Sequence, residues 1–175
     1  GDPFVSDCAD YDVSLTLPEN YAVAASGREI SAASGENGLK TCRYEGKNLR
    51  DVAFVCSEKF KVAECKAKTS KNASAAGKYY YIDDAEPQKT LGAAREALEY
   101  YSESYGAYPY GTYSVAQTGF CYGGMEYPAL SFLAAGLAEE EKIYATAHET
   151  AHQWWYALVG SNAVEEAWQD EGAAE

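Results

Sequence analysis

Polar and apolar residues alternate along the first third of the chain. The segment from Tyr11 to Leu17 has a period of two, which is typical of a strand with one buried face, and Pro18-Glu19-Asn20 ends it. Residues 26–27 and 34–38 are rich in Gly, Ser and Asn, so we expect turns there. Further strands are expected at residues 21–25, 40–44 and 52–56. This part of the sequence therefore predicts an antiparallel β-structure.

The pattern changes near residue 62, after which strands begin to alternate with helices. Strands are expected at residues 61–68, 78–82, 113–117 and 122–126, and a polar hairpin loop at 69–77. Helices are expected at residues 88–105, 139–159 and 168–175. The expected buried stripe of the second helix, with spacings of three and four, is Ile143, Ala147, Ala151, Trp154 and Leu158. The sequence thus predicts the α+β class, with a division between residues 1–62 and 63–175.

The composition is that of an ordinary soluble protein with an acidic surplus. Of 175 residues, 47% are hydrophobic and 23% are charged, and the net charge is −13. This balance disfavours nucleic acid as a partner, because nucleic-acid binding needs a basic surface. No stretch approaches the roughly 18 apolar residues that span a bilayer, and no segment resembles a signal peptide. The sequence does not decide the compartment or the oligomeric state.

The cysteines and aromatic residues are interpreted as structural. None of the five cysteines forms a C-x-x-C pair, so a cysteine zinc site is not expected and free buried thiols are the default. A disulfide among Cys42, Cys56 and Cys65 stays open as an alternative. The sixteen tyrosines suit half-buried strands, and the three tryptophans are expected in the core: Trp154, Trp155 and Trp168.

Both histidines of the chain lie in one short motif, His148-Glu149-Thr150-Ala151-His152. Residues four apart lie on the same face of a helix, about 5–6 Å apart, so the two imidazoles can reach one metal ion. A catalytic zinc ion takes three protein ligands and keeps a fourth position for water. Glu171, in Asp170-Glu171-Gly172, is the expected third ligand, and Glu149 is placed to accept a proton from that water. The sequence predicts one Zn²⁺ per chain.

Two motifs in this order resemble a known family. The stretch from His148 to Glu171 resembles the gluzincin metallopeptidases, in which eighteen residues separate His-Glu-x-x-His from a ligating Glu. The segment Gly123-Gly124-Met125-Glu126-Tyr127 resembles the Gly-x-Met-Glu-Asn exopeptidase signature of the aminopeptidase N and leukotriene-hydrolase family, 22 residues before the first histidine. The run His152-Gln153-Trp154-Trp155-Tyr156 is similar to the continuation of the zinc motif in that family.

The resemblance implies a role for each matching residue. It makes His148, His152 and Glu171 the zinc ligands and Glu149 the general base. Glu126 would bind the free α-ammonium group of a peptide, which is a charge-assisted contact that only a chain end can make. The backbone of the substrate would lie along an edge strand formed by Gly123, Gly124 and Met125. Tyr127 stands where the family has Asn, which puts the details of the backbone pocket in doubt.

The resemblance also implies a fold and an activity. Residues 1–62 would be the end of an antiparallel β-saddle domain, and residues 63–175 the N-terminal half of a thermolysin-like zinc peptidase domain. The expected activity is that of a zinc-dependent aminopeptidase, which removes N-terminal residues from peptides with a free N-terminus by metal-activated water attack. Because the chain lacks an initial Met and a stop signal after Glu171, we expect an incomplete chain with little or no activity. Glu175, four residues after Glu171, is expected either to contact a ligating histidine or to be exposed.

Two other function classes compete with this one. A zinc endopeptidase or an epoxide hydrolase would use the same metal site, but Glu126 argues against an endopeptidase. A non-catalytic peptide-binding module would have no need of a general base, so an intact Glu149 argues against it.

Overall fold

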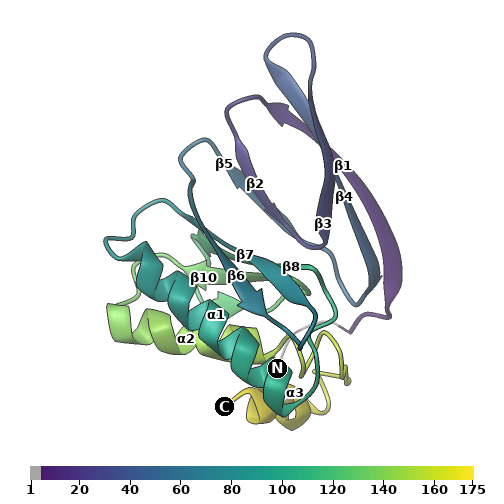
Figure 1. Ribbon diagram of the computed structural model, residues 1–175, viewed down its shortest axis with the longest axis vertical. Coiled ribbons are helices and arrows are strands. Elements are labelled where there is room, and N and C mark those ends of the chain that lie inside the picture. The colour runs from purple at the N-terminus through teal and green to yellow at the C-terminus, as the bar shows by residue number, and fades with distance from the viewer. Residues whose placement is uncertain (1–4) are drawn as a thin grey trace.

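The computed structural model describes residues 5–175 and has the α+β class expected from the sequence (Figure 1). The strands are β1 (Ala9–Pro18), β2 (Ala22–Ala25), β3 (Arg28–Ser34), β4 (Leu39–Leu49), β5 (Phe54–Ser57), β6 (Lys61–Lys68), β7 (Ser74–Tyr81), β8 (Thr112–Thr118), β9 (Gly124–Met125) and β10 (Leu130–Ala134). The helices are α1 (Pro87–Ser104), α2 (Glu139–Ala151) and α3 (Ala167–Ala174). No helix among the described residues is long and apolar enough to cross a membrane.

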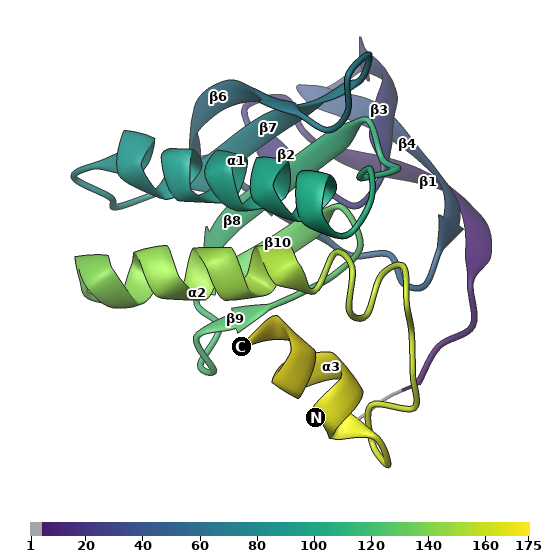
Figure 2. The same cartoon turned by 60° about the horizontal axis from the view of Figure 1, so that its bottom comes forward.

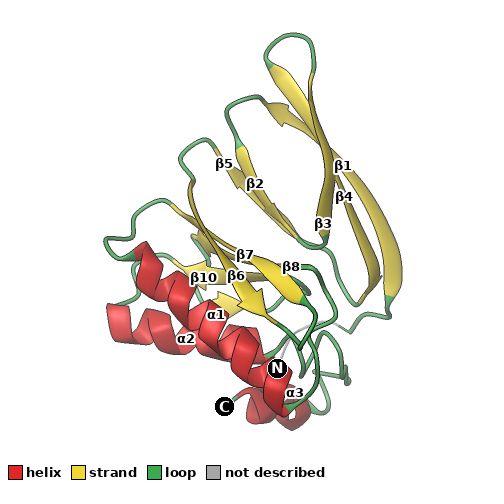
Figure 3. Cartoon of the chain, viewed as in Figure 1, coloured by secondary structure: helices red, strands yellow, loops and turns green. Residues whose placement is uncertain are grey.

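The strands β1 to β5 form two small antiparallel sheets, which we call the N-terminal region (residues 5–57). One sheet has the order β1-β4-β3, and the other pairs β2 with β5 (Figure 3). In the first sheet Leu15 lies opposite Cys42 and Leu17 opposite Lys40, so the alternation in β1 sets which side chains face inward. The small core of this region consists of Leu17, Val23, Ala25, Cys42 and Tyr44.

The rest of the chain, residues 61–175, is the C-terminal region and contains one five-stranded sheet with the order β6-β7-β8-β10-β9. The pairs β7–β8 and β8–β10 are parallel, whereas β6–β7 and β10–β9 are antiparallel. The helix α1 connects the parallel strands β7 and β8, and it lies beside α2 across one face of the sheet (Figure 2). The core between them includes Tyr79, Leu98, Tyr113, Leu133 and Trp154.

The structure corrects several element boundaries. The strand β9 lies at the sheet edge as expected but has only two residues, and β7 begins at Ser74, so the loop after β6 is shorter than predicted. The small residues that begin β7 carry a weak strand signal in the sequence. The pairing of Ser74 with Lys68 of β6 makes them part of the strand. The strands β3 and β10 were not predicted. Most of β3 is exposed, and β10 is a buried central strand, so neither has a strict alternation.

The helix α2 ends at Ala151, so the prediction of a helix as far as residue 159 is wrong. After Ala151 the amide groups of Gln153 and Trp154 bond to carbonyls three residues earlier, which tightens the backbone into a turn. Of the stripe expected on this helix, Ala151 is buried and Ile143 and Ala147 are half-buried, whereas Leu158 lies beyond the helix end and is exposed. Trp154 is buried as expected, but Trp168 is 70% exposed and does not belong to the core.

The cysteines are all free, so the alternative of a disulfide among Cys42, Cys56 and Cys65 is wrong. Burial of the five thiols was expected, but only Cys42 is fully buried, and Cys8, Cys56 and Cys121 are exposed. Burial raises the pKa of the Cys42 and Cys65 thiols, which makes both less reactive.

Candidate metal and peptide site

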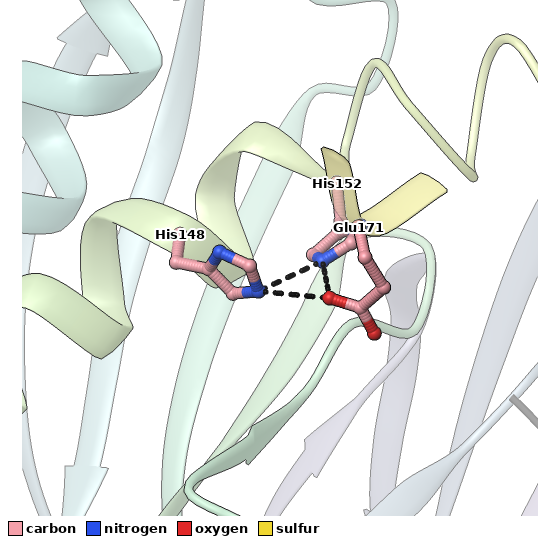
Figure 4. Close-up of side chains that lie close together, drawn as sticks. All are labelled: His148, His152 and Glu171. Atoms are coloured by element: carbon pink, nitrogen blue, oxygen red, sulfur yellow. Dashed lines mark hydrogen bonds and ion pairs between the residues drawn. The ribbon is translucent and has the colours of Figure 1, made fainter. Parts of the chain in front are cut away.

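Three of the predicted site residues converge on one point from two helices. His148 lies in the last turn of α2, His152 directly follows this helix, and Glu171 lies in α3 (Figure 4). The connection between α2 and α3, residues 152–166, turns the chain back, so the Glu171 carboxylate faces both imidazoles. Helix spacing alone predicts that the two histidines share one face, and the packing of α3 against α2 brings Glu171 to them.

The three donor atoms form a nearly equilateral triangle. His148 Nε2 lies 3.1 Å from His152 Nε2 and 3.3 Å from Glu171 Oε2, and His152 Nε2 lies 3.6 Å from the same carboxylate oxygen. A tetrahedral ion with bonds of about 2.0–2.1 Å has neighbouring ligand atoms about 3.3–3.4 Å apart. The observed separations bracket this value, so the triangle fits three ligands of a tetrahedral zinc ion.

The His152 ring is oriented by groups on its other nitrogen. The ring is 1% exposed, and its Nδ1 lies 2.8 Å from Asp170 Oδ1 and 2.9 Å from the carbonyl oxygen of Trp155. Because both neighbours are acceptors, Nδ1 carries the hydrogen in the neutral ring, and the lone pair on Nε2 is directed at His148 and Glu171. Sequence reasoning gave Asp170 no role, although its position directly before Glu171 offered a signal.

The charges around the imidazoles favour a cation. Burial by itself would lower the pKa of His152, but hydrogen bonds to the carboxylates of Asp170 and Glu171 outweigh burial and raise it to about 11. The hydrogen bond from His152 lowers the pKa of Glu171 to about 2, against the opposing effect of burial. A divalent cation supplies the same positive charge that these carboxylates favour, so the electrostatics agree with the geometry.

Glu149 is buried against the backbone of the edge strand β9. A Cβ atom at Gly124 would lie 2.3 Å from Glu149 Oε1 and 2.4 Å from its Cδ, so only glycine leaves room for this carboxylate. Ser131 in the neighbouring strand β10 donates a hydrogen bond of 3.3 Å to the backbone carbonyl of Glu149. The glycine predicted to contact substrate thus also sets the position of the predicted base.

Glu126 follows β9 directly and is buried beside the histidines. Its Oε1 lies 3.9 Å from His152 Nδ1. The loop that carries it is tied to the turn after α2 by Gln153, whose side chain accepts from the Ala129 amide at 2.8 Å and donates to the Tyr127 carbonyl at 3.2 Å. Gln153 is fully buried, so it links the two predicted motifs of the sequence through direct hydrogen bonds.

One cavity of about 1130 Å³ is lined by every residue predicted for the site. These are Gly123, Gly124, Met125, Glu126, His148, Glu149, His152 and Glu171. Sequence reasoning missed a further wall of the cavity from α2, where the Tyr144 ring stacks on His148 and its hydroxyl donates to Glu175 at 2.6 Å. Glu175 is therefore exposed and bonded to a tyrosine, and the alternative that it contacts a histidine is not seen.

A buried hydroxyl network supports the helix that carries the histidines. The Tyr113 hydroxyl in β8 lies 2.9 Å from Ser131 Oγ and 3.0 Å from Thr150 Oγ1. Thr150 in turn donates to the carbonyl of Thr146 one turn earlier. These contacts fix the rotation of α2 about its axis, because Thr150 faces the sheet while His148 and His152 face the cavity.

Comparison with known proteins gives relatives in sequence and in structure. No family model matches the chain. Leucine aminopeptidase 2 of Aspergillus niger is 34% identical over 97% of the chain and 28% of its own length. Leukotriene A-4 hydrolase of Xenopus laevis is 34% identical over 79 residues, which cover 43% of the chain and 13% of the relative.

The fold is also that of solved metallopeptidase structures. The crystal structure of an M1 zinc metallopeptidase from Deinococcus radiodurans matches 97% of the chain and 39% of its own, with a TM-score of 0.77 and 22% identity. A point mutant of that protein matches with a TM-score of 0.80. The chain thus spans well under half the length of each of these proteins. Its sequence relatives and its motifs place the chain in the aminopeptidase N and leukotriene-hydrolase family of zinc metallopeptidases.

Proposed function

We propose that this chain carries the metal and substrate-amine sites of a zinc-dependent aminopeptidase that removes N-terminal residues from peptides. The observation that carries the proposal is the triangle of His148, His152 and Glu171, which shares one cavity with the carboxylates of Glu149 and Glu126. Two relatives support it, since one is named a leucine aminopeptidase and the other a hydrolase. We assign the activity to the whole protein, because the relatives are several times longer than these residues.

Zinc would be bound by Nε2 of His148, Nε2 of His152 and one carboxylate oxygen of Glu171, with one ion per chain. When bound, it supplies Lewis acidity toward a peptide carbonyl group and a water molecule. Asp170 and the Trp155 carbonyl keep the His152 ring in the orientation that this ligand set needs. The relatives in solved structures are zinc metallopeptidases, which agrees with this choice of metal.

Glu149 would accept a proton from water on its carboxylate and return it to the leaving amine. Its side chain is buried at the cavity wall against Gly124, which holds the carboxylate beside the histidine that precedes it in the chain. Glu149 does not belong to the triangle of proposed ligands, so its carboxylate stays available to accept a proton from water.

Glu126 would bind the α-ammonium group of the substrate and so fix which peptide bond is cut. The carboxylate is buried beside His152, and burial strengthens a contact with a cationic chain end. The strand β9 is the last strand of the five-stranded sheet within residues 5–175, so its outer edge can pair with the extended backbone of a peptide. One residue would leave in each turnover.

The domain assignment is part of the same proposal. Residues 1–62 would belong to an antiparallel β-saddle domain, and residues 63–175 to the first half of a thermolysin-like catalytic domain. The change from small antiparallel sheets to the sheet covered by α1 and α2 supports this division.

The first test is the metal content of the purified chain after exhaustive dialysis, with His148→Ala as the control. We expect close to one zinc ion per chain, lost in the variant. In the whole protein, Glu149→Gln should keep the metal and lose turnover. A Glu149→Gln enzyme that cleaves aminoacyl substrates at the normal rate would show that another group is the base.

A second test separates the aminopeptidase from a zinc endopeptidase. A peptide and its N-acetylated form are offered to the whole protein, and cleavage is followed by mass spectrometry. We expect no cleavage of the acetylated peptide, because Glu126 then lacks a cationic partner. Internal cleavage of both peptides at equal rates would favour an endopeptidase instead.

A further inference from the structure

The turn after α2 has a strained residue close to the proposed metal site. Tyr156 has a φ angle of +144°, a backbone conformation that residues with a side chain rarely adopt. The residue is buried, and it lies four positions after His152. Such a conformation persists where the surrounding structure determines it, so the contacts of Tyr156 decide whether the turn keeps its shape.

Two hydrogen bonds join Tyr156 to the N-terminal region, more than a hundred residues away along the chain. Arg50 Nε donates to the Tyr156 carbonyl at 3.0 Å, and the Tyr156 hydroxyl donates to the Asp51 carboxylate. The same arginine donates to the Ser6 carbonyl at 2.9 Å through Nη1. A Cβ atom at Gly160 would lie 1.8 Å from Arg50 Cζ, so this glycine leaves the space that the guanidinium occupies.

The turn carries these contacts to His152. The Trp155 carbonyl, which accepts from His152 Nδ1 at 2.9 Å, belongs to the peptide group that precedes Tyr156. Rotation about φ of Tyr156 sets the direction of that peptide group relative to the rest of Tyr156. Because Arg50 and Asp51 hold the carbonyl and the hydroxyl of Tyr156, the Trp155 carbonyl can turn relative to these groups only by rotation about this one φ angle. The amide of Ala157 closes the turn by donating to the His152 carbonyl at 3.0 Å.

We propose that Arg50 and Asp51 are positioning residues for the metal site, which act through Tyr156 and the Trp155 carbonyl on the His152 ring. The inference rests on the proposed function, because it assumes that His152 binds zinc through Nε2. It adds to that function a dependence of metal affinity on the N-terminal region. Partners of a ligating histidine are typically worth 10–100-fold in metal affinity, and a contact one step further away should give about tenfold.

The experiment compares zinc affinity in three variants of the purified chain, measured by competition with a chromophoric chelator. Arg50→Ala removes the donor to the Tyr156 carbonyl, and Tyr156→Phe removes only the hydroxyl that contacts Asp51. Arg43→Ala is the matched control, since it deletes an arginine from the same strand region that contacts Asp12 and Glu45 instead. We expect about tenfold weaker binding in the first two variants and no change in the control.

Two further readouts separate positioning from a general loss of stability. The visible spectrum of the Co²⁺-loaded chain should change in Arg50→Ala and in Tyr156→Phe, because it reports the geometry around the ion. The conservative variant Arg50→Lys should bind zinc more tightly than Arg50→Ala, because its ammonium group can still donate to the Tyr156 carbonyl. An Arg50→Lys variant that binds no better than Arg50→Ala would overturn the proposal.

The outcomes also distinguish this inference from the proposed function. If the unmodified chain binds zinc at His148 and His152, and Tyr156→Phe and Arg50→Ala bind it equally well, the positioning role is wrong and the metal site stands. If the unmodified chain binds no zinc, both fall together. A lower unfolding temperature with unchanged zinc affinity and Co²⁺ spectrum would identify the contacts as purely structural.

Discussion

The two regions of the molecule place similar ion pairs in opposite surroundings. In the N-terminal region Arg43 lies 2.7 Å from Asp12 across β1 and β4, with side chains 41% and 57% exposed. In the C-terminal region Lys142 of α2 lies 2.9 Å from Asp84 before α1, with side chains 13% and 1% exposed. Water screens the attraction between the two exposed charges. In the buried pair, Lys142 takes the place of water around the Asp84 carboxylate.

The same contrast extends to the other polar groups of the two regions. The carboxylate of Asp84 also accepts hydrogen bonds from the Tyr79 and Thr90 hydroxyls, so it joins β7, α1 and α2. The N-terminal region places its polar groups on strands that are mostly exposed. Buried polar groups such as Asp84 therefore join neighbouring elements in the C-terminal region, whereas most polar groups on β1 and β3 face water. Four substitutions test this difference.

The largest effect is expected at Gly124, which lies against the proposed base Glu149. Gly124→Ala places a methyl group where the Glu149 carboxylate lies, so the carboxylate must move. A displacement of about 1 Å can cost about 100-fold in rate, and we expect that loss in kcat of the whole protein, with zinc content unchanged. The matched control is Gly92→Ala in α1, where a Cβ atom meets nothing within 4 Å and alanine favours the helix. Equal activity of both variants would contradict the proposed place of Glu149.

The buried ion pair is expected to matter next, for stability. Asp84→Asn leaves Lys142 without its charged partner, and we expect a loss of about 2 kcal/mol in the free energy of unfolding, measured by urea denaturation. Burial by itself raises the pKa of Asp84, but the hydrogen bonds from Lys142 and its other donors outweigh burial and lower it. The carboxylate therefore stabilises the fold at pH values above about 4, where it is ionised in the unfolded chain too.

This contribution is lost as the pH falls through the lowered pKa of the folded state. The difference in stability between the unmodified chain and Asp84→Asn should accordingly be full at pH 7 and shrink below about pH 4. A difference that stays constant down to pH 2 would show that Asp84 acts without its charge.

A smaller effect is expected at the partner of His152. Asp170→Asn keeps an acceptor near Nδ1 but removes the negative charge that favours a cation at the imidazoles. We expect zinc binding to weaken by about tenfold in a chelator competition assay. Glu175→Gln is the control, because its carboxylate accepts a hydrogen bond from Tyr144 instead. Equal losses in both would indicate a general effect of charge rather than a specific contact.

The smallest effect is expected at the exposed pair. Arg43 lowers the pKa of Asp12 by a hydrogen bond, but both groups are open to water. We expect Asp12→Asn to leave the unfolding temperature nearly unchanged, with any difference vanishing in 0.5 M salt. A loss as large as that in Asp84→Asn would remove the contrast between the two regions.

Local patterns in the sequence predict much of the secondary structure. The alternation in residues 11–17 predicts β1, and the helix expected at residues 88–105 matches α1 within one residue at each end. The spacing of His148 and His152 predicted that their rings face the same way, because four residues make about one helical turn. Segments without a strict period, such as β3 and β10, were missed because their neighbours rather than their own residues determine them.

The sequence by itself therefore determined the pair of histidines, the glutamate between them and the acidic residue of a second helix, since each depends on local spacing or a short motif. Tertiary structure alone decided the contacts of Asp170 with His152, of Gly124 with Glu149 and of Arg50 with Tyr156. These join residues between 18 and 106 positions apart, and no period or motif in the chain marks them. The physical reason is that the spacing of the two histidines follows from one helical turn, whereas the orientation of their rings depends on every segment packed around them.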